Sequence, residues 1–431
     1  MVSVRCDAAR LKAWLAGLAL LASVAGCSLV TGDANAAPVP GVTERPCPSP
    51  VNEGNGCIYL GTLSDLSTGP FRALGVPVTH AQRAFWDRVN RDGGIGGYDI
   101  DVTTYVRDTG YDPRRHLQAY LEIKDRVLAL AQTLGTATTE EILGDLRAAR
   151  MLGVPASFSS RWEFEDVMLE SGPSYCFHAM NAIDYMVREH RVRRAMSVHF
   201  AGDYGKDTAA GARVAARANG LRFREVETPP GEGAQRPAVR EILRFKPDVV
   251  MVSAGPAETA AIVAQASAAG YRGRFAGEYT TWHWSVLRTP AGAAMKKHFY
   301  VLGSWKPFAT DAPGYAAMRG ALGRVRPDDT FTAGWILSYP LKAVLERAAK
   351  AGELNREGLY RALRQTTFVD YEGIMPEVAG NFAGTANTAA FRQSVVARPD
   401  DRQYTGLKVL TDYFTGPTAR AYRLDAPCSQ S

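Results

Sequence analysis

The hydroxyl side chains of Thr136 and Thr138 lie in a segment whose sequence is suited to bind an anion. They lie in a loop between a short apolar strand, Val127–Ala131, and a predicted helix that runs to Arg150. Thr138–Glu141 has the Thr-x-x-Glu spacing of a capping box, so we expect the helix to begin here with unpaired backbone N–H groups. Such a helix start attracts carboxylates. Capping and turn chemistry explain each hydroxyl equally well when it is taken singly.

The element that must position such a loop is a strand, helix, strand unit between Cys57 and Pro113. Cys57–Leu63 reads as a strand, and an apolar stripe with helical spacing follows it at Ala81, Ala84, Phe85, Arg88 and Val89. Residues 99–106 then alternate as in a second strand. A parallel unit of this kind crosses over right-handed and binds ligands beyond the carboxyl ends of its strands. Ser64 and Phe71, at the ends of the first loop, are therefore candidate ligand-binding residues.

Motifs for other kinds of chemistry are incomplete or absent. Ala201–Lys206 imitates a phosphate loop, but Phe200 and Asp207 stand where glycine and Ser or Thr are needed. Gly94 and Gly96 would need a glycine at Asp99 to make a dinucleotide fingerprint. The sequence contains no GxSxG elbow, no HExxH motif and no CxxC pair, so we expect no enzyme activity, no cofactor and no metal.

The first residues are typical of an exported protein. Arg5, Arg10 and Lys12 precede an uncharged Leu/Ala-rich run, and Val24-Ala-Gly-Cys27 resembles a lipobox, which predicts a signal peptide over residues 1–26 and a lipidated Cys27. An uncleaved membrane helix over Ala13–Gly32 is the alternative. Cleavage lowers the formal net charge from +6 to +4, because three basic residues and Asp7 leave, and this charge requires no nucleic acid.

Residues 27–56 are rich in Gly, Pro, Ala, Ser and Asn, which predicts a flexible tether with disorder up to about Cys47. Four further cysteines would remain in an oxidising compartment: Cys47, Cys57, Cys176 and Cys428. Local closure favours a Cys47–Cys57 disulfide, which leaves Cys176 with Cys428. The sequence leaves the other pairings and free thiols open.

The whole opening, from the strand at Cys57 through Asn90-x-x-Gly-Gly-Ile-x-Gly97 to Arg107-Asp-Thr-Gly-Tyr-Asp-Pro113, resembles one known family. It is similar to the extracytoplasmic solute-binding proteins of ABC transporters, in the branched-chain amino acid (type I) group. The resemblance extends roughly from Cys57 to Ile374. It implies an α/β fold with two doubly wound lobes joined by three hinge crossings, near Tyr175, Ser304 and Val369. The length of 431 residues is also too great for one ordinary core.

The resemblance implies further site residues. Ser159 and Ser160 lie in the loop that matches the family's hydroxyl-rich binding loop, and Tyr204 matches a ligand-facing tyrosine in a Tyr-Gly pair. In the family, an acidic residue near this point holds the ligand's ammonium group. The candidate positions here are Glu278 and, one residue further along, Tyr279. Trp282 offers an aromatic face to a cation, although core packing is the more common role of such a residue.

The resulting domain prediction is a signal peptide (1–26), a lipidated tether (27–56), lobe one (57–175 with 304–369) and lobe two (176–303 with 370–431). Such a protein would be a monomer anchored by its lipid to the outer face of the cytoplasmic membrane. It would bind a small polar solute, such as an amino acid or amide, and deliver it to the permease and ATPase subunits of an ABC importer. A ligand-sensing or adhesive surface lipoprotein on the same fold is the alternative.

Overall fold

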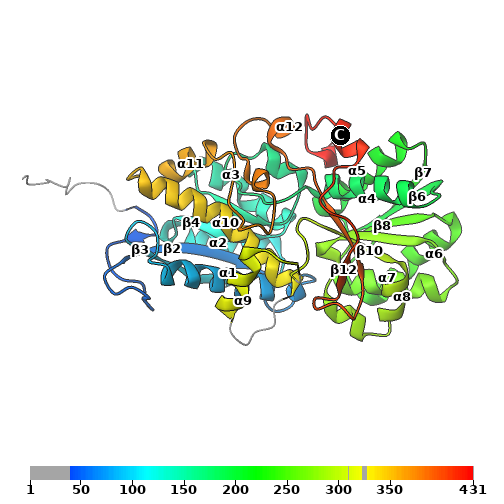
Figure 1. Ribbon diagram of the computed structural model, residues 1–431, viewed down its shortest axis with the longest axis horizontal. Helices are drawn as coiled ribbons and strands as arrows, with labels where there is room; N and C mark the ends of the chain where they lie inside the picture. The colour runs from blue at the N-terminus through cyan, green and yellow to red at the C-terminus, as the bar shows by residue number, and fades with distance from the viewer. Residues whose placement is uncertain (1–38, 309, 323–327, 431) are drawn as a thin grey trace, which may run out of the picture. The chain divides into compact units, whose positions relative to one another are not determined.

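The structure is a computed structural model that describes residues 39–308, 310–322 and 328–430. The predicted signal peptide and the predicted lipidation site Cys27 lie outside the described residues. Among the helices that are described, none has the length and apolar character needed to span a membrane. The described part begins at Val39 and contains two β-sheets, each with its own helices (Figure 1).

Sheet 1 has five strands and, with the helices packed on it, forms what we call lobe 1. Strands β2, β3, β4 and β5 are parallel, with β3 and β4 on opposite edges of β2, and the short β1 pairs antiparallel with β2. β2 is buried on both faces, as is usual for the centre of a parallel sheet. The strands are β1 Val42–Thr43, β2 Gly56–Ser64, β3 Tyr98–Asp108, β4 Ala129–Leu134 and β5 Gly153–Ala156.

Two helix pairs, α1 with α10 and α2 with α3, pack in lobe 1. The predicted apolar stripe of α1 is buried at Ala81, Phe85 and Val89, and the Phe85 ring lies edge-on 5.2 Å from the Trp335 ring of α10. Parallel pairing of β2 with β3 across α1 confirms the predicted strand, helix, strand unit. The helices are α1 Arg72–Arg91, α2 Pro113–Ile123, α3 Thr136–Ala148, α9 Pro313–Leu322, α10 Asp329–Lys350 and α11 Arg356–Arg364.

Sheet 2 has seven strands in the order β12-β11-β10-β9-β8-β6-β7 and forms the centre of lobe 2. The strands from β6 to β10 are parallel, whereas β11 and β12 add antiparallel partners from the end of the chain. They are β6 Arg194–His199, β7 Arg222–Glu227, β8 Val249–Ser253, β9 Arg274–Glu278, β10 Phe299–Gly303, β11 Val395–Pro399 and β12 Leu407–Val409.

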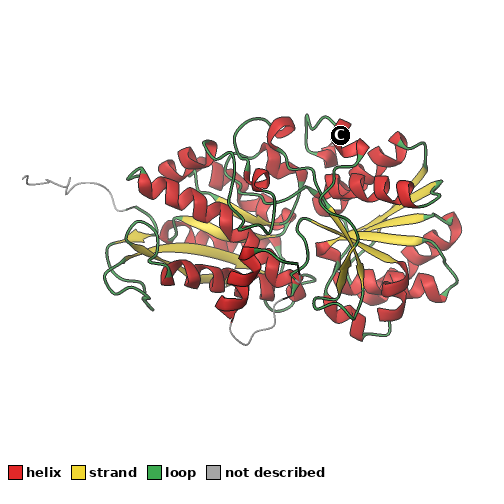
Figure 2. Cartoon of the chain, viewed as in Figure 1, coloured by secondary structure: helices red, strands yellow, loops and turns green. Residues whose placement is uncertain are grey.

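Helices cover both faces of sheet 2. Helices α4 and α5 lie on one face, and α6, α7 and α8 lie on the other (Figures 1 and 2). The short α12 precedes β11, and α13 packs on α4 and α5. Their bounds are α4 Tyr175–Glu189, α5 Asp203–Ala218, α6 Arg236–Phe245, α7 Pro256–Ala268, α8 Gly292–His298, α12 Ala386–Ala389 and α13 Pro417–Ala421.

The chain passes between the lobes three times, which confirms the predicted architecture. The crossings run from β5 to α4, from β10 to α9, and from α11 to β11. Glu372 in the third crossing is fixed to lobe 1, because its carboxylate pairs with both terminal nitrogens of Arg88, at 2.9 and 2.8 Å. Arg88, predicted to be the one basic member of the α1 stripe, therefore has a specific partner.

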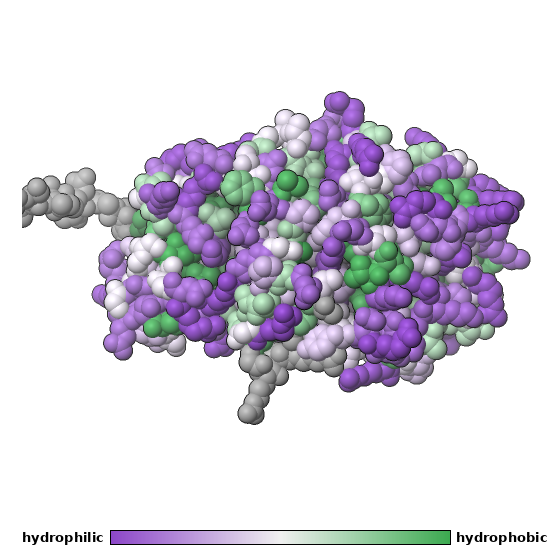
Figure 3. Space-filling model, in the orientation of Figure 1, coloured by the Kyte–Doolittle hydropathy of each residue, from purple (hydrophilic) through white to green (hydrophobic). Residues whose placement is uncertain are grey.

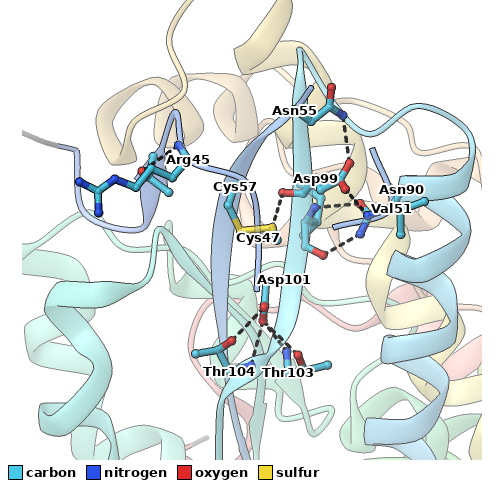
Figure 4. The surroundings of a disulfide bond; sticks show 12 residues. Arg45, Cys47, Val51, Asn55, Cys57, Asn90, Asp99, Asp101, Thr103 and Thr104 are labelled. Atoms are coloured by element: carbon cyan, nitrogen blue, oxygen red, sulfur yellow. Dashed lines mark hydrogen bonds between the residues drawn. A yellow bond between two sulfur atoms is a disulfide. The ribbon is translucent and has the colours of Figure 1, made fainter. Parts of the chain in front are cut away.

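The segment before β2 is folded, so the prediction of a flexible tether is wrong from Val39 onward. Val42 pairs with Ile58 in sheet 1, and Cys47 forms the predicted disulfide with Cys57 (Figure 4). The Asp99 carboxylate, buried in β3, accepts hydrogen bonds from the N–H groups of Val51 and Asn52. Burial by itself raises the pKa of Asp99, but these hydrogen bonds and others outweigh it and hold the pKa below its ordinary value. Composition gave no sign of these tertiary contacts.

The second disulfide joins Cys176 at the start of α4 to Cys428 near the end of the chain, so both preferred pairings are confirmed. It ties the last residues to lobe 2, where the sequence pattern is weak. On the face that Figure 3 shows, hydrophilic residues cover most of the surface and hydrophobic residues form small separate patches. The large apolar clusters lie inside the lobes instead.

Candidate functional site

A cleft lined by both lobes and by the crossings is the candidate site. Its cavity volume is about 70 Å³, so the cleft is narrow. Its walls come from the start of α1, the loops after β4 and β5, the start of α5, the loop after β9, and the start of α10. They comprise Phe71, Leu74, Val78, Tyr111, Leu134, Gly135, Thr136, Ala156, Ser157, Phe158, Tyr175, Tyr204, Tyr279, Thr280, Trp282, Trp305, Asp329, Thr330, Ala333 and Leu337.

Aromatic rings make up much of the wall and touch one another in sequence. The chain of ring contacts begins with Tyr111 and Phe71, whose centroids are 4.7 Å apart, and it ends with Trp305 and Tyr279, at 4.9 Å. Between them it passes through Tyr204, Tyr175 and Phe158. A lining of this kind favours a ligand with a large apolar part.

One end of the ring chain meets the start of α3. Gly135 has a φ of +97°, and a Cβ there would lie 2.4 Å from the Tyr111 ring, so the turn into the helix needs glycine. Thr136 is the first residue of the helix and 1% exposed, and its Oγ1 has no hydrogen-bond partner within the described residues. The N–H groups of a first helical turn also lack partners inside the helix. This end of the cleft can therefore receive an anion or another acceptor group.

The other end meets the start of α10. Asp329 accepts a hydrogen bond from the Phe308 N–H, 2.9 Å from its Oδ1, while its Oδ2 has no partner in the described parts of the chain. Burial raises the pKa of Asp329 to about 7, although the Phe308 N–H and the nearby Thr405 hydroxyl act in the opposite direction. Trp305, on the neighbouring crossing, is fully buried, and its indole Nε1 is also unpaired among the residues described.

Two of the tyrosine hydroxyls in the cleft, those of Tyr204 and Tyr279, already have protein partners. The Tyr279 hydroxyl donates to the carbonyl oxygen of Trp305 at 2.8 Å, and the Tyr204 hydroxyl lies 3.0 Å from Thr280 Oγ1. Burial raises the pKa of both tyrosines well above the ordinary value, so they stay neutral at physiological pH. They supply ring surface and neutral dipoles rather than charge.

Five of the ten residues predicted to bind ligand line this cleft: Phe71, Thr136, Tyr204, Tyr279 and Trp282. The other five, Ser64, Thr138, Ser159, Ser160 and Glu278, lie outside its lining as described. Ser64 faces the interior of lobe 1, where its Oγ accepts from Gln132 Nε2 at 2.8 Å. Thr138 is bonded backward to the carbonyl oxygens of Leu134 and Gly135. Helix α3 therefore begins two residues before the predicted capping box, which does not set its start.

Ser159 and Ser160 hold carboxylates of α5 in lobe 2 instead of facing the cleft. The Ser159 hydroxyl donates to Asp203, and Ser160 donates to Asp207 through both its hydroxyl and its N–H. These bonds link the loop after β5 to the opposite lobe beside the first crossing. Their hydroxyls are used structurally, which a sequence pattern cannot distinguish from an open binding loop.

Glu278 is buried behind the cleft wall. Its Oε1 accepts from the Thr208 hydroxyl at 2.9 Å, and burial raises its pKa to about 8. Its Oε2 has no hydrogen-bond partner among the described residues. Of the two offset positions, Tyr279 is the one that reaches the cleft.

Sequence reasoning missed the residues that the crossings bring to the cleft. Tyr175 and Trp305 stand at or directly after the predicted crossings, and Asp329 begins the long helix that follows. A crossing between two lobes necessarily borders the space between them. The predicted positions of the crossings were therefore an available signal for Tyr175 and Trp305.

The family comparison agrees with this geometry. The family model described as periplasmic binding protein matches residues 58–402. The chain belongs to the periplasmic binding protein family. Among the described residues of this family member, no cluster of His, Cys, Asp or Glu is suited to hold a metal ion. A search of curated proteins finds no match.

Solved structures with a similar fold include substrate-binding proteins of ABC transporters. A fatty acid ABC transporter substrate-binding protein from Thermomonospora curvata is 25% identical, with a TM-score of 0.81 over 89% of this chain and 96% of that one. A branched-chain amino acid ABC transporter protein from Thermus thermophilus, with bound valine, is 17% identical, with a TM-score of 0.73 over 85% and 98%. A leucine-binding protein from Thermotoga maritima is 15% identical, with a TM-score of 0.69 over 82% and 97%.

Proposed function

We propose that this periplasmic binding protein is the extracytoplasmic receptor of an ABC importer and that its cleft binds a mainly apolar carboxylate. The importer's permease and ATPase subunits are the proposed partners. The anchor is proposed to be a lipid on Cys27, which follows the signal-like segment. Ligand binding between lobes that are joined by three crossings is a hinge geometry, so closure can report occupancy to a permease.

The observation that carries the proposed ligand class is the unpaired hydroxyl of Thr136 at the start of α3, in a cleft whose other walls are largely aromatic and aliphatic. A carboxylate at this helix start would satisfy the hydroxyl and free N–H groups together. The apolar remainder of the ligand would lie along the rings. This ligand differs from the polar solute expected from the sequence, because Glu278, the candidate partner for an ammonium group, lies behind the wall.

The fatty acid binding protein of Thermomonospora curvata supports the same ligand class, since it is the relative with the highest TM-score among those described above. Linear and aromatic acids both fit the chemistry of the cleft. The shape of the cleft determines which chain length or ring size of acid it accepts, and binding measurements with a panel of acids would determine this preference directly.

Titration calorimetry with matched pairs tests this proposal. Octanoate and 3-phenylpropanoate should bind, while octanamide and 3-phenylpropanamide should bind at least tenfold more weakly, because a charge-assisted hydrogen bond is worth about 1.5–3 kcal/mol. Thr136→Val should weaken binding of the acids about tenfold. Thr138→Val is the matched control, since its hydroxyl is bonded to the helix's own backbone. Equal affinity for acids and amides would exclude the carboxylate site.

A further inference from the structure

The end of the cleft opposite Thr136 holds polar groups that are closed to water and incompletely bonded. We call Trp305 and Asp329 the distal pair. Trp305 is fully buried and Asp329 is 4% exposed, and both line the cleft. Their Nε1 and Oδ2 atoms have no hydrogen-bond partner within the described residues. A buried donor or acceptor left in this state is costly, and its presence calls for an explanation.

The two members of the distal pair belong to one corner of the site. Phe308, three residues after Trp305, donates its N–H to Asp329 Oδ1 at 2.9 Å. The Tyr279 hydroxyl donates to the Trp305 carbonyl oxygen, and the charge of Asp329 acts on Tyr279. The Thr405 hydroxyl lies beside Asp329 and lowers its pKa as a hydrogen-bond donor does, although among the described residues no donor comes within full hydrogen-bond distance of Asp329 Oδ2. The protein thus holds the Asp329 carboxyl group in place by one oxygen and leaves the other free.

The atoms of the distal pair restrict what can satisfy them. An indole N–H only donates, so the incoming group must have a lone pair. An ammonium group has none and is excluded as the common partner. A hydroxyl group can accept from Trp305 and donate to Asp329 at the same time. A methyl group at the end of an unsubstituted chain would leave both atoms unpaired.

Resting on the proposed carboxylate site at α3, we propose that the ligand carries a second polar group, a hydroxyl at the far end of its apolar part, which Trp305 and Asp329 bind. The ring contacts from Tyr111 to Tyr279 connect these two ends of the cleft. The ligand class is therefore that of hydroxylated carboxylic acids. Unsubstituted acids of the same length would fill the cleft but leave the distal pair unsatisfied.

Calorimetry with two pairs of acids tests the distal pair: octanoate with 8-hydroxyoctanoate, and 3-phenylpropanoate with 3-(4-hydroxyphenyl)propanoate. In the wild-type protein the hydroxyl should strengthen binding at least tenfold in one pair. Trp305→Phe removes the N–H while keeping a ring, and should reduce this gain to less than threefold without weakening the unsubstituted acid to the same extent. Asp329→Ala should have the same effect on the gain.

Trp282→Phe is the matched control, because it also removes an indole from the cleft wall but should leave the hydroxyl gain unchanged. Thermal melting of each variant checks that it is folded. Acids that bind without any gain from the hydroxyl would overturn this proposal and leave the proposed function standing. A gain that persists in both Trp305→Phe and Asp329→Ala would also overturn it. Failure of every acid to bind would overturn the proposed function and this inference together.

Discussion

Two buried aspartates beside the cleft, Asp207 and Asp329, differ in how completely they are bonded. Burial raises the pKa of both. Asp207 accepts from the N–H groups of Ser160 and Cys176, at 3.0 and 3.2 Å, and from the Ser160 hydroxyl. Asp329 accepts one bond from protein, from the Phe308 N–H, within the residues described. The difference teaches that burial and a raised pKa do not by themselves mark a binding group, because the Asp207 carboxylate is fully used by the protein's own donors.

The largest expected effect concerns the disulfide that supports the Asp207 region. Cys176 donates its N–H to Asp207, and Cys428 donates its N–H to Ser160 Oγ. The double variant Cys176→Ser, Cys428→Ser opens a loop with a sequence separation of 252 residues, worth roughly 5 kcal/mol in the chain-entropy model. The variant Cys47→Ser, Cys57→Ser, with a separation of 10, should lose roughly 3 kcal/mol. Guanidinium unfolding measures both, and equal losses would contradict this ranking.

The second prediction concerns how the raised pKa of Asp329 makes the unfolding free energy depend on pH. Its pKa is 3.8 in the ordinary state and about 7 when folded, so the folded state holds the proton more tightly. The stability this provides is fully present below about pH 4 and is lost as the pH rises towards 7, by at most about 4 kcal/mol. Asp329→Asn should therefore flatten the decline in unfolding free energy over this range. An unchanged pH profile would mean that Asp329 titrates normally.

Asp207 should matter for stability and not for ligand binding. Asp207→Ala leaves two buried backbone N–H groups unpaired and should lower the unfolding free energy by about 3 kcal/mol. The affinity of the folded protein for an acid ligand should change less than threefold. Asp203→Ala is the control on the same helix, because Asp203 is bonded by the hydroxyls of Ser159 and Ser429 and not by backbone groups. A large loss of affinity in Asp207→Ala would place it in the site.

The smallest expected effect is on the stability of the ligand-free protein, and it concerns two threonines at the start of α3, Thr136 and Thr138. Thr138→Val removes the bond to the Gly135 carbonyl oxygen and should cost about 1 kcal/mol. Thr136→Val removes a hydroxyl that has no partner among the described residues, so stability should stay within about 0.5 kcal/mol of the wild type. Chemical denaturation of both variants provides the test. A clear loss in Thr136→Val would show that its hydroxyl is already bonded.

Local patterns predicted most of the scaffold. The apolar stripe over Ala81–Val89 and the strand at Cys57 gave the first strand, helix, strand unit, because spacing along the chain determines which residues share a face. The alternation predicted for β3 is only partly kept, since Asp99 and Asp101 on its polar face are buried. Both carboxylates accept hydrogen bonds. Asp101 accepts from the nearby Thr104 N–H, whereas Asp99 accepts from the Val51 N–H, which is distant along the chain.

By itself the sequence determined the fold class, the three crossings, the preferred disulfide pairs and five of the twenty residues that line the cleft. These depend on periodicity, on order along the chain and on resemblance to a family. Only the tertiary structure decided which polar atoms are free. Ser160 and Thr136 both follow strands of sheet 1. The Ser160 hydroxyl donates to Asp207 of the opposite lobe, whereas the Thr136 hydroxyl has no partner within the described residues. Hydrogen bonding is short-ranged, so partners more than 40 residues apart along the chain become known only when the lobes are packed together.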